Sequence, residues 1–400
     1  MRNRSKQASL IILSISLGFW TTAICATKVA FSATVSTISQ QLSQTDRAFL
    51  QDPLDPTVLF QKGDRLDTDG NIVTDVAFDR TGNYIATVSD SLSLWHRDGT
   101  PIVDRLDNDG LPIKYVRFSP DGTLIAVARE TPDRSFEIAS EYKTVELWQF
   151  DGEELQHFQT LPHGEWVKKV DFSPNGKTIA TVGRDRAIKV WNLNGWQLKT
   201  FPGEDFSFSP DGRTLATTGT DGNVTLWRVG GWILRPILEI PHEVPITRVS
   251  FSPDGNTIAT TSDDGTIFLW SRDGEAIAQI KGHDDAVNRL EFSSDGRWLT
   301  TAGRDSQVRL WHLDGLTVST FDGDNAFFSP DSRFIAIDDG NSQIGILNLE
   351  TWKSQSIPIP RYSYGSFYFS PDSQTFALTE NFDVQLWDLA IDNGQLTIDN

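Results

Sequence analysis

Phe251-Ser252-Pro253-Asp254-Gly255 opens a unit of sequence that recurs along the chain, and Trp270 closes this copy 19 residues after its Phe. There are eight copies, and their opening residues follow one another at a mean interval of about 42 residues, the length of one propeller blade. The opening residues are Phe78, Phe118, Phe172, Phe208, Phe251, Phe292, Phe328 and Phe369. The closing residues are Trp95, Trp148, Trp191, Trp227, Trp270, Trp311, Leu347 and Trp387.

Each copy contains strands separated by explicit turn signals. Apolar residues alternate into the Phe, which is typical of a half-buried strand. The turn that follows ends this strand, because Pro has no N–H to donate and Gly readily takes a positive φ. Residues 257–260 then indicate a second strand and residues 267–270 a third. Dipeptides such as Asp273-Gly274 follow the closing residue and favour a hairpin, so a fourth, outer strand is expected.

An all-β, eight-bladed β-propeller of four-stranded antiparallel blades follows, because such sheets bury both faces only by packing on one another around a ring. We assign it residues 57–400, with a seven-bladed ring as the alternative. Residues 163–270 and 283–387 align at an offset of 120 residues, which favours eight blades. Residues 57–66 precede the first copy and are predicted to supply the outer strand of the last blade, with the tail after Trp387 as a competitor.

The repeat resembles the WD40 family over about residues 57–390, and it is similar to bacterial, cyanobacterial-type WD-repeat proteins. By that resemblance, a His, a Thr, a turn Asp and the closing Trp form a hydrogen-bonded set that holds a blade together. Three copies carry such a set: His163, Thr181, Asp185 and Trp191; His242, Thr260, Asp264 and Trp270; and His283, Thr301, Asp305 and Trp311. The composition also resembles a hydrolase triad, but the Trp favours a structural role. The fourth copy has Lys199 at the His position.

The first residues of the chain have a different character. Arg2, Arg4 and Lys6 precede an uncharged stretch from Ala8 to Thr27, which is the pattern of an export signal and is also long enough to span a bilayer as a transmembrane helix. We predict a signal peptide or signal anchor over residues 1–32 and a polar linker over residues 33–56. The protein is therefore expected in the periplasm or another extracytoplasmic space, or anchored in the membrane by residues 8–27. Whether residues 1–32 are cleaved is left open.

Composition excludes several classes of function. The net charge of −19 argues against nucleic-acid binding, which needs clustered Lys and Arg. The single cysteine, Cys25, lies in the export segment, so the ring has no thiol chemistry and no cysteine-based zinc site. Residues 67–70 and 107–110 are rich in Asp but lack the pattern of an EF-hand loop. We predict no metal and no cofactor, and a monomeric ring.

Departures from the repeat indicate where a partner would bind. By the resemblance, Trp166, Lys168, Arg184 and Arg304 lie on the face of the ring that carries the His-containing loops, here called the loop face. Trp and Arg often dominate interfaces, although Trp166 could instead pack on its neighbouring blade. The extra residues of copy two, around 130–142 and including Glu137, are expected to project from the same face. Trp196, Trp232 and Trp352 follow the outer turns and are expected to pack between blades.

The predicted function is a non-catalytic scaffold that binds a protein or peptide through the loop face. One alternative is a TolB-like envelope-assembly propeller, which shares the Ser-Pro-Asp-Gly turn but lacks the pairing of a loop His with a turn Asp. Another is a propeller enzyme, either a hydrolase or a quinoprotein, which needs polar groups converging on the central channel. The innermost strands offer Val, Lys, Arg and Asn without a recurring carboxylate or His set, so no catalytic residue is predicted.

Overall fold

The fold is given by a computed structural model that describes residues 60–67, 72–107, 113–129, 144–230, 233–314, 317–340, 343–358, 367–380 and 382–389. The chain divides into two units, residues 1–54 and 55–400. The predicted export segment, the linker, residues 68–70 and 108–110, and the insertion with Glu137 lie outside the described residues. Within the described ranges, no helix is both long and apolar enough for a bilayer crossing.

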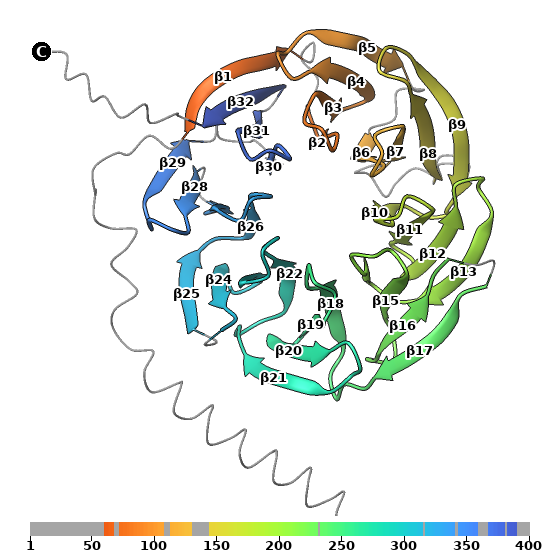
Figure 1. The fold of residues 1–400 in the computed structure, drawn as a ribbon, viewed down its shortest axis with the longest axis vertical. Coiled ribbons are helices and arrows are strands. Elements are labelled where there is room, and N and C mark those ends of the chain that lie inside the picture. Colours follow the sequence, from red (N-terminus) through yellow and green to blue (C-terminus); the bar gives the residue numbers. More distant parts are fainter. Residues whose placement is uncertain are drawn as a thin grey trace, which may run out of the picture. The chain divides into compact units, whose positions relative to one another are not determined.

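The second unit is an eight-bladed propeller, and each blade is an antiparallel sheet of four strands (Figure 1). Blades 1 and 2 contain β2 (Asp75–Phe78), β3 (Tyr84–Val88), β4 (Ser91–His96) and β5 (Pro101–Asp107), then β6 (Ile113–Phe118), β7 (Leu124–Arg129), β8 (Thr144–Phe150) and β9 (Leu155–Pro162). Blades 3 and 4 contain β10 (Val167–Phe172), β11 (Thr178–Gly183), β12 (Ala187–Asn192) and β13 (Gln197–Pro202), then β14 (Phe206–Phe208), β15 (Thr214–Thr218), β16 (Val224–Arg228) and β17 (Arg235–Ile240). Blades 5 and 6 contain β18 (Ile246–Phe251), β19 (Thr257–Ser262), β20 (Thr266–Ser271) and β21 (Ala276–Lys281), then β22 (Val287–Phe292), β23 (Trp298–Gly303), β24 (Gln307–His312) and β25 (Thr317–Asp322). Blades 7 and 8 contain β26 (Asn325–Phe328), β27 (Phe334–Asp338), β28 (Gln343–Asn348) and β29 (Ser354–Pro358), then β30 (Phe367–Phe369), β31 (Thr375–Glu380), β32 (Asp383–Leu389) and β1 (Phe60–Asp67).

The ring closes where the sequence predicted. Strand β1 pairs antiparallel with β32, with Phe60 opposite Leu389 and Leu66 opposite Val384, and so forms the outer strand of blade 8 (Figure 1). Leu66 is fully buried in a cluster that also contains Val76 of blade 1. The two ends of the repeat region are thus joined by both a strand ladder and a shared apolar core.

The Ser-Pro-Asp-Gly turns are fixed by their own side chains. In blade 5, Ser252 Oγ donates a hydrogen bond to Asp254 Oδ1 at 2.5 Å and accepts one from the backbone N–H of Thr257 at 2.9 Å, while Gly255 has a φ of +71°. Blades 7 and 8 use Ser332 and Ser373 at the Gly position, with φ values of +61° and +59°. Both serines accept a backbone N–H of the preceding blade, which helps to hold this conformation.

Candidate functional site

The closing Trp of a blade is held by a Thr on the neighbouring strand. In blade 3, Trp191 pairs with Ile179 in the strand register, and Thr181 lies two residues further along β11. The indole N–H of Trp191 donates to Thr181 Oγ1 at 3.0 Å. The same bond joins Trp95 to Thr87, Trp227 to Thr217, Trp270 to Thr260 and Trp311 to Thr301, at 2.9 to 3.2 Å.

Blades 2 and 8 lack the hydroxyl group at this position. The register places Val127 and Leu378 where the other blades have Thr. The indole nitrogens of Trp148 and Trp387 are buried and have no hydrogen-bond partner among the described residues. A buried donor without a partner costs about 1–3 kcal/mol, so these two blades hold their Trp by packing alone.

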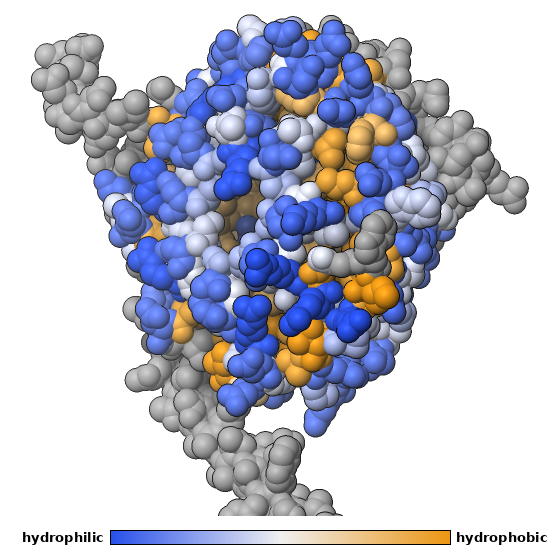
Figure 2. Space-filling model, turned by 45° about the vertical axis from the view of Figure 1, so that its right-hand side comes forward, coloured by the Kyte–Doolittle hydropathy of each residue, from blue (hydrophilic) through white to orange (hydrophobic). Residues whose placement is uncertain are grey.

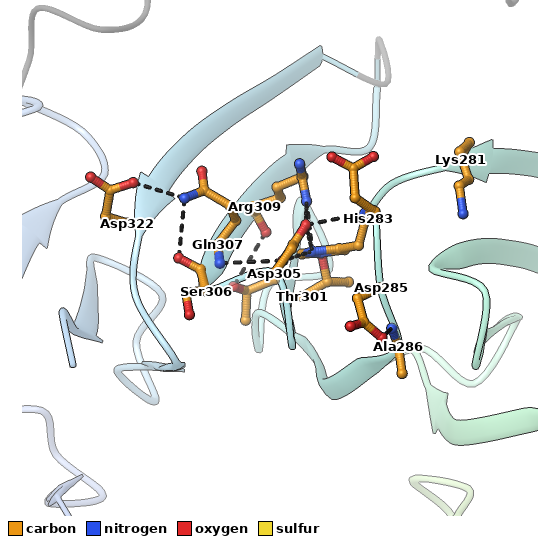
Figure 3. Close-up of polar contacts among 12 residues, drawn as sticks. Lys281, His283, Asp285, Ala286, Thr301, Asp305, Ser306, Gln307, Arg309 and Asp322 are labelled. Carbon is orange, nitrogen blue, oxygen red and sulfur yellow. Dashed lines mark hydrogen bonds and ion pairs between the residues drawn. The ribbon is translucent and has the colours of Figure 1, made fainter.

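Blade 6 extends the bond into a chain that reaches the loop face (Figure 3). His283 Nε2 lies 2.7 Å from Thr301 Oγ1, and His283 Nδ1 lies 2.9 Å from Asp305 Oδ1. Asp305 also accepts a hydrogen bond from Arg309 Nη1 at 2.9 Å and one from the backbone N–H of Asp284. Trp311 completes the chain through Thr301. The loop before β22 is therefore tied to the hairpin between β23 and β24.

Blade 3 makes a looser version of this chain. His163 uses Nδ1 to reach Thr181 Oγ1 at 2.9 Å, and its Nε2 lies 3.6 Å from Asp185 Oδ1. That separation is too long for a hydrogen bond, and His163 Nε2 has no hydrogen-bond partner in the described structure.

Blades 4 and 5 depart from the expected set. In blade 5, His242 bonds Thr260 and the carbonyl of Ile240, whereas Asp264 accepts from Ser262 and from the backbone of Thr266. For blade 4, the predicted Lys199 lies exposed on β13, the outer strand of blade 3, because the loop before β14 is shorter. Its Nζ lies 5.7 Å from the centroid of the Trp227 ring.

Burial keeps these histidines neutral near pH 7. It lowers the pKa of His163 and of His242 to about 4, and it lowers that of His283 against the opposing effect of Asp305. Burial opposes the ionised form of Asp305 as well, yet the hydrogen bonds from His283 and Arg309 lower its pKa to about 2. Thr301 is fully buried and capped by Trp311, so its hydroxyl group is not placed to attack a substrate.

The candidate binding residues lie on two separate blades and differ in exposure, with Trp166, Lys168 and Arg184 in blade 3 and Arg304 in blade 6. The backbone N–H of Arg184 donates to the carbonyl of Trp166 at 2.8 Å, and that of Arg304 donates to Ala286 at 2.9 Å in the same position of blade 6. Lys168, Arg184 and Arg304 are exposed, whereas the Trp166 side chain is 9% exposed. Trp166 thus packs mainly into the ring, and the basic side chains form the accessible surface.

Comparison with known proteins identifies the repeat. The family model described as WD domain, G-beta repeat matches residues 155–192, 195–228, 235–271 and 274–312. Residues 155–312 contain four WD40 repeats. The matched units end at the closing residues of blades 3 to 6, and three of these four blades have the His at the loop position.

In sequence, individual relatives match only a short part of this chain. Human WD repeat and SOCS box-containing protein 1 is 28% identical over 22% of this chain and 18% of its own length. Nuclear distribution protein PAC1-1 of Uncinocarpus reesii is 36% identical over 15% of this chain and 14% of its own length. The C-terminal WD40 domain of Sif2 superposes with a TM-score of 0.66 at 16% identity, covering 83% of this chain and 99% of that domain. This last likeness shows the fold.

One sequence prediction, on the packing of the outer Trp residues, was wrong. Trp196 does not pack between blades, because its side chain is 68% exposed, and Trp352 is 41% exposed beside Trp298; Trp232 lies outside the described residues. The innermost strands also carry carboxylates, which the repeat alignment concealed because they occupy two different positions relative to the Phe. These carboxylates are Asp75 on β2, Asp171 on β10, Asp205 beside β14 and Glu291 on β22.

Proposed function

We propose that this WD40 propeller is a non-catalytic scaffold that binds a protein or peptide through its loop face. WD40 propellers are typically protein-interaction scaffolds, and the repeats matched by the family model include blades 3, 5 and 6, in which a loop His bonds a buried Thr. The observation that carries the proposal is that Arg184 and Arg304, in turns, and Lys168, near the start of β10, are exposed in the two blades whose loops are anchored by buried His–Thr–Trp chains. A rigid scaffold with exposed side chains binds at low conformational cost.

The geometry favours this function over the alternatives. A TolB-like propeller would lack the loop His and turn Asp contact that His283 and Asp305 make at 2.9 Å. An enzyme of the hydrolase class would need an accessible nucleophile, whereas Thr181 and Thr301 are fully buried. Because the exposed loop residues named above are basic, an acidic segment is the chemistry that would suit the partner.

Site-specific photo-crosslinking tests the loop-face assignment. We would place a photoreactive phenylalanine analogue at Lys168 or Arg304, and at the exposed Lys177 or Arg213 as matched controls. The control positions directly follow Gly176 and Gly212 of the turns at the other end of the innermost strands. We expect protein adducts from the first pair alone. Adducts of equal yield from the turn positions, or adducts from neither pair, would contradict the proposal.

We also propose that residues 8–27 export the chain and leave it either released or anchored outside the cytoplasm. The support is the basic residues Arg2, Arg4 and Lys6 ahead of an uncharged stretch. Fractionation of cells that produce the full chain, beside a variant lacking residues 1–32, checks this. Equal recovery of both forms from the cytoplasm would exclude export.

A further inference from the structure

The innermost strands carry a belt of charged and aromatic side chains that face the central channel. Side chains one and three residues before the opening Phe share one face of the strand, whereas the residue between them turns into the blade. On β10, for example, Val170 is buried, while Lys169 and Asp171 on either side are only partly buried. These innermost strands surround the middle of the ring (Figure 1). The space-filling view has a recess near the middle of the visible face, with hydrophilic and hydrophobic atoms at its floor (Figure 2).

Part of this belt has an evident structural role. Asp75 Oδ2 accepts hydrogen bonds from the backbone N–H of Val116 and from Arg117 Nη1, at 3.1 and 2.7 Å. Three blades further on, Asp205 accepts from Lys169 Nζ at 2.9 Å and from the backbone N–H of Val249 at 3.1 Å. Each carboxylate joins its blade to the next one, so these charges are satisfied within the protein.

Arg289 and Glu291 on β22 are different. Within the described structure, neither side chain takes part in a hydrogen bond or an ion pair, and Glu291 Oε2 is buried without a partner. The Arg289 guanidinium carbon lies 3.6 Å from the centroid of the Phe327 ring, which holds one face of the cation. Its N–H groups point outward in the plane of the guanidinium and keep their capacity to donate.

An unpaired charge in such a place is costly, so it calls for an explanation. Burial strips a charged group of water, and that loss is offset only when hydrogen-bonding partners replace the water. Burial raises the pKa of Glu291 to about 7 and lowers that of Arg289. A purely structural residue at either position would avoid both costs, whereas a ligand that supplied the missing partners would remove them.

The groups around this pair define the chemistry of such a ligand. Arg248 is already committed to the carbonyls of Asn288 and Thr247. Aromatic rings cover one side, since Phe327 lies 5.6 Å from Tyr368 between ring centroids. Tyr368 in turn is reached by Arg117 at 3.4 Å. The free groups are therefore one cation and one carboxylate, beside an aromatic wall.

We propose that Arg289 and Glu291 form a binding site in the central channel for a small zwitterion with an apolar side chain, of the α-amino-acid class. The ligand carboxylate pairs with the Arg289 guanidinium, its ammonium group donates to Glu291, and its side chain packs on Phe327 and Tyr368. Residues two apart on a strand lie about 7 Å apart, which leaves room for a zwitterionic head group between the two side chains. This site is separate from the loop face and does not depend on the proposed scaffold function.

Three matched probes test the class of ligand. L-Phenylalanine carries both charges, 3-phenylpropanoate only the carboxylate, and 2-phenylethylamine only the ammonium group. Titration calorimetry on the full chain is expected to show binding of L-phenylalanine at least tenfold tighter than that of either single-charge probe. Equal binding of 3-phenylpropanoate, or no binding of L-phenylalanine, would overturn the proposal.

Variants of Arg289 and Glu291 test where L-phenylalanine binds. Arg289→Gln and Glu291→Gln should each weaken L-phenylalanine binding by at least tenfold, whereas Lys177→Gln at an exposed turn should leave it unchanged. Thermal unfolding of each variant checks that the ring is intact, and Glu291→Gln, which removes an unpaired carboxylate, serves if Arg289→Gln does not fold. Binding that persists unchanged in Glu291→Gln would overturn the assignment.

Discussion

Blades 2 and 6 are built on the same four strands and close with the same residue type, yet they hold that residue differently. In blade 6, Trp311 donates to Thr301, and the bond continues through His283 to Asp305. In blade 2, Val127 replaces the Thr and the Trp148 indole has no described hydrogen-bond partner. Apolar packing and turn chemistry are therefore enough to form a blade, and the polar chain is an addition that ties the loop face down.

The largest loss of stability is expected at a core position that the two blades have in common. Leu147 in blade 2 and Leu310 in blade 6 each precede the closing Trp and are fully buried. Replacing either by Ala should lower the free energy of unfolding by about 2–5 kcal/mol. Denaturant unfolding of Leu147→Ala and Leu310→Ala measures this. A loss of stability at only one of the two sites would show that the two blades do not depend on the same kind of apolar packing.

The next largest loss of stability is expected in blade 6. Thr301→Val keeps the shape of the side chain but leaves the Trp311 indole and the His283 ring without their shared partner, which should cost about 2–3 kcal/mol. Thr301→Ser retains the hydroxyl group and is the control. If Thr301→Val were as stable as Thr301→Ser, the polar chain would contribute nothing to stability.

The reciprocal change in blade 2 should be favourable. Val127→Thr supplies an acceptor for the Trp148 indole, and a gain of about 1 kcal/mol in the free energy of unfolding is expected. The same measurement on Leu378→Thr in blade 8 should give a smaller gain, because the Thr side chain also leaves a cavity there. Destabilisation by Val127→Thr would mean that blade 2 is adapted to the missing bond.

Near neutral pH the buried histidines have little effect on how stability depends on pH, and their effect on stability appears on acidification. The folded pKa of His163 and of His242 is about 4, below the ordinary 6.5, so the unfolded chain binds more protons between these values. Stability should therefore fall as the pH drops from 6.5 towards 4. Glu291 acts in the opposite sense, because its folded pKa of about 7 lies above the ordinary 4.5, so the folded chain binds more protons between these values and stability falls as the pH rises from 4.5 to 7.

Thermal unfolding between pH 4.5 and 8 measures this dependence. His163→Gln should flatten the fall in stability on acidification, whereas Glu291→Gln, which removes an opposing slope between pH 4.5 and 7, should steepen it. An acid limb of the same steepness in His163→Gln would exclude His163 as its source.

The blade architecture was predictable because it depends on local signals. Phe251, the turn after it and Trp270 recur at fixed spacing, and the strand before Asp75 has no other blade to join, so ring closure by β1 also followed. Contacts that depend on loop length were not predictable. Asp264 bonds within its own turn instead of to His242, and Lys199 lies on an outer strand.

The sequence did not reveal the carboxylates of the central channel, for a related reason. Asp75 and Asp205 lie three residues before the opening Phe, whereas Asp171 and Glu291 lie one residue before it, so no single repeat position carries a carboxylate. Only the ring brings these positions to one surface. The exposure of individual Trp side chains could not be predicted from the sequence either. Trp166 and Trp196 each directly precede a strand, yet tertiary packing buries the first and leaves the second in solvent.

The difference between blades 2 and 6 is tested most directly by NMR of the Trp indole N–H groups in ¹⁵N-Trp-labelled protein, assigned by single Trp→Phe variants. Hydrogen-bonded indole protons resonate downfield of unbonded ones. We expect Trp311 and Trp191 among the downfield signals and Trp148 and Trp387 apart from them, with Val127→Thr moving Trp148 alone into the downfield group. A Trp148 signal that already lies with Trp311 in the unaltered protein would contradict the proposed difference between the blades.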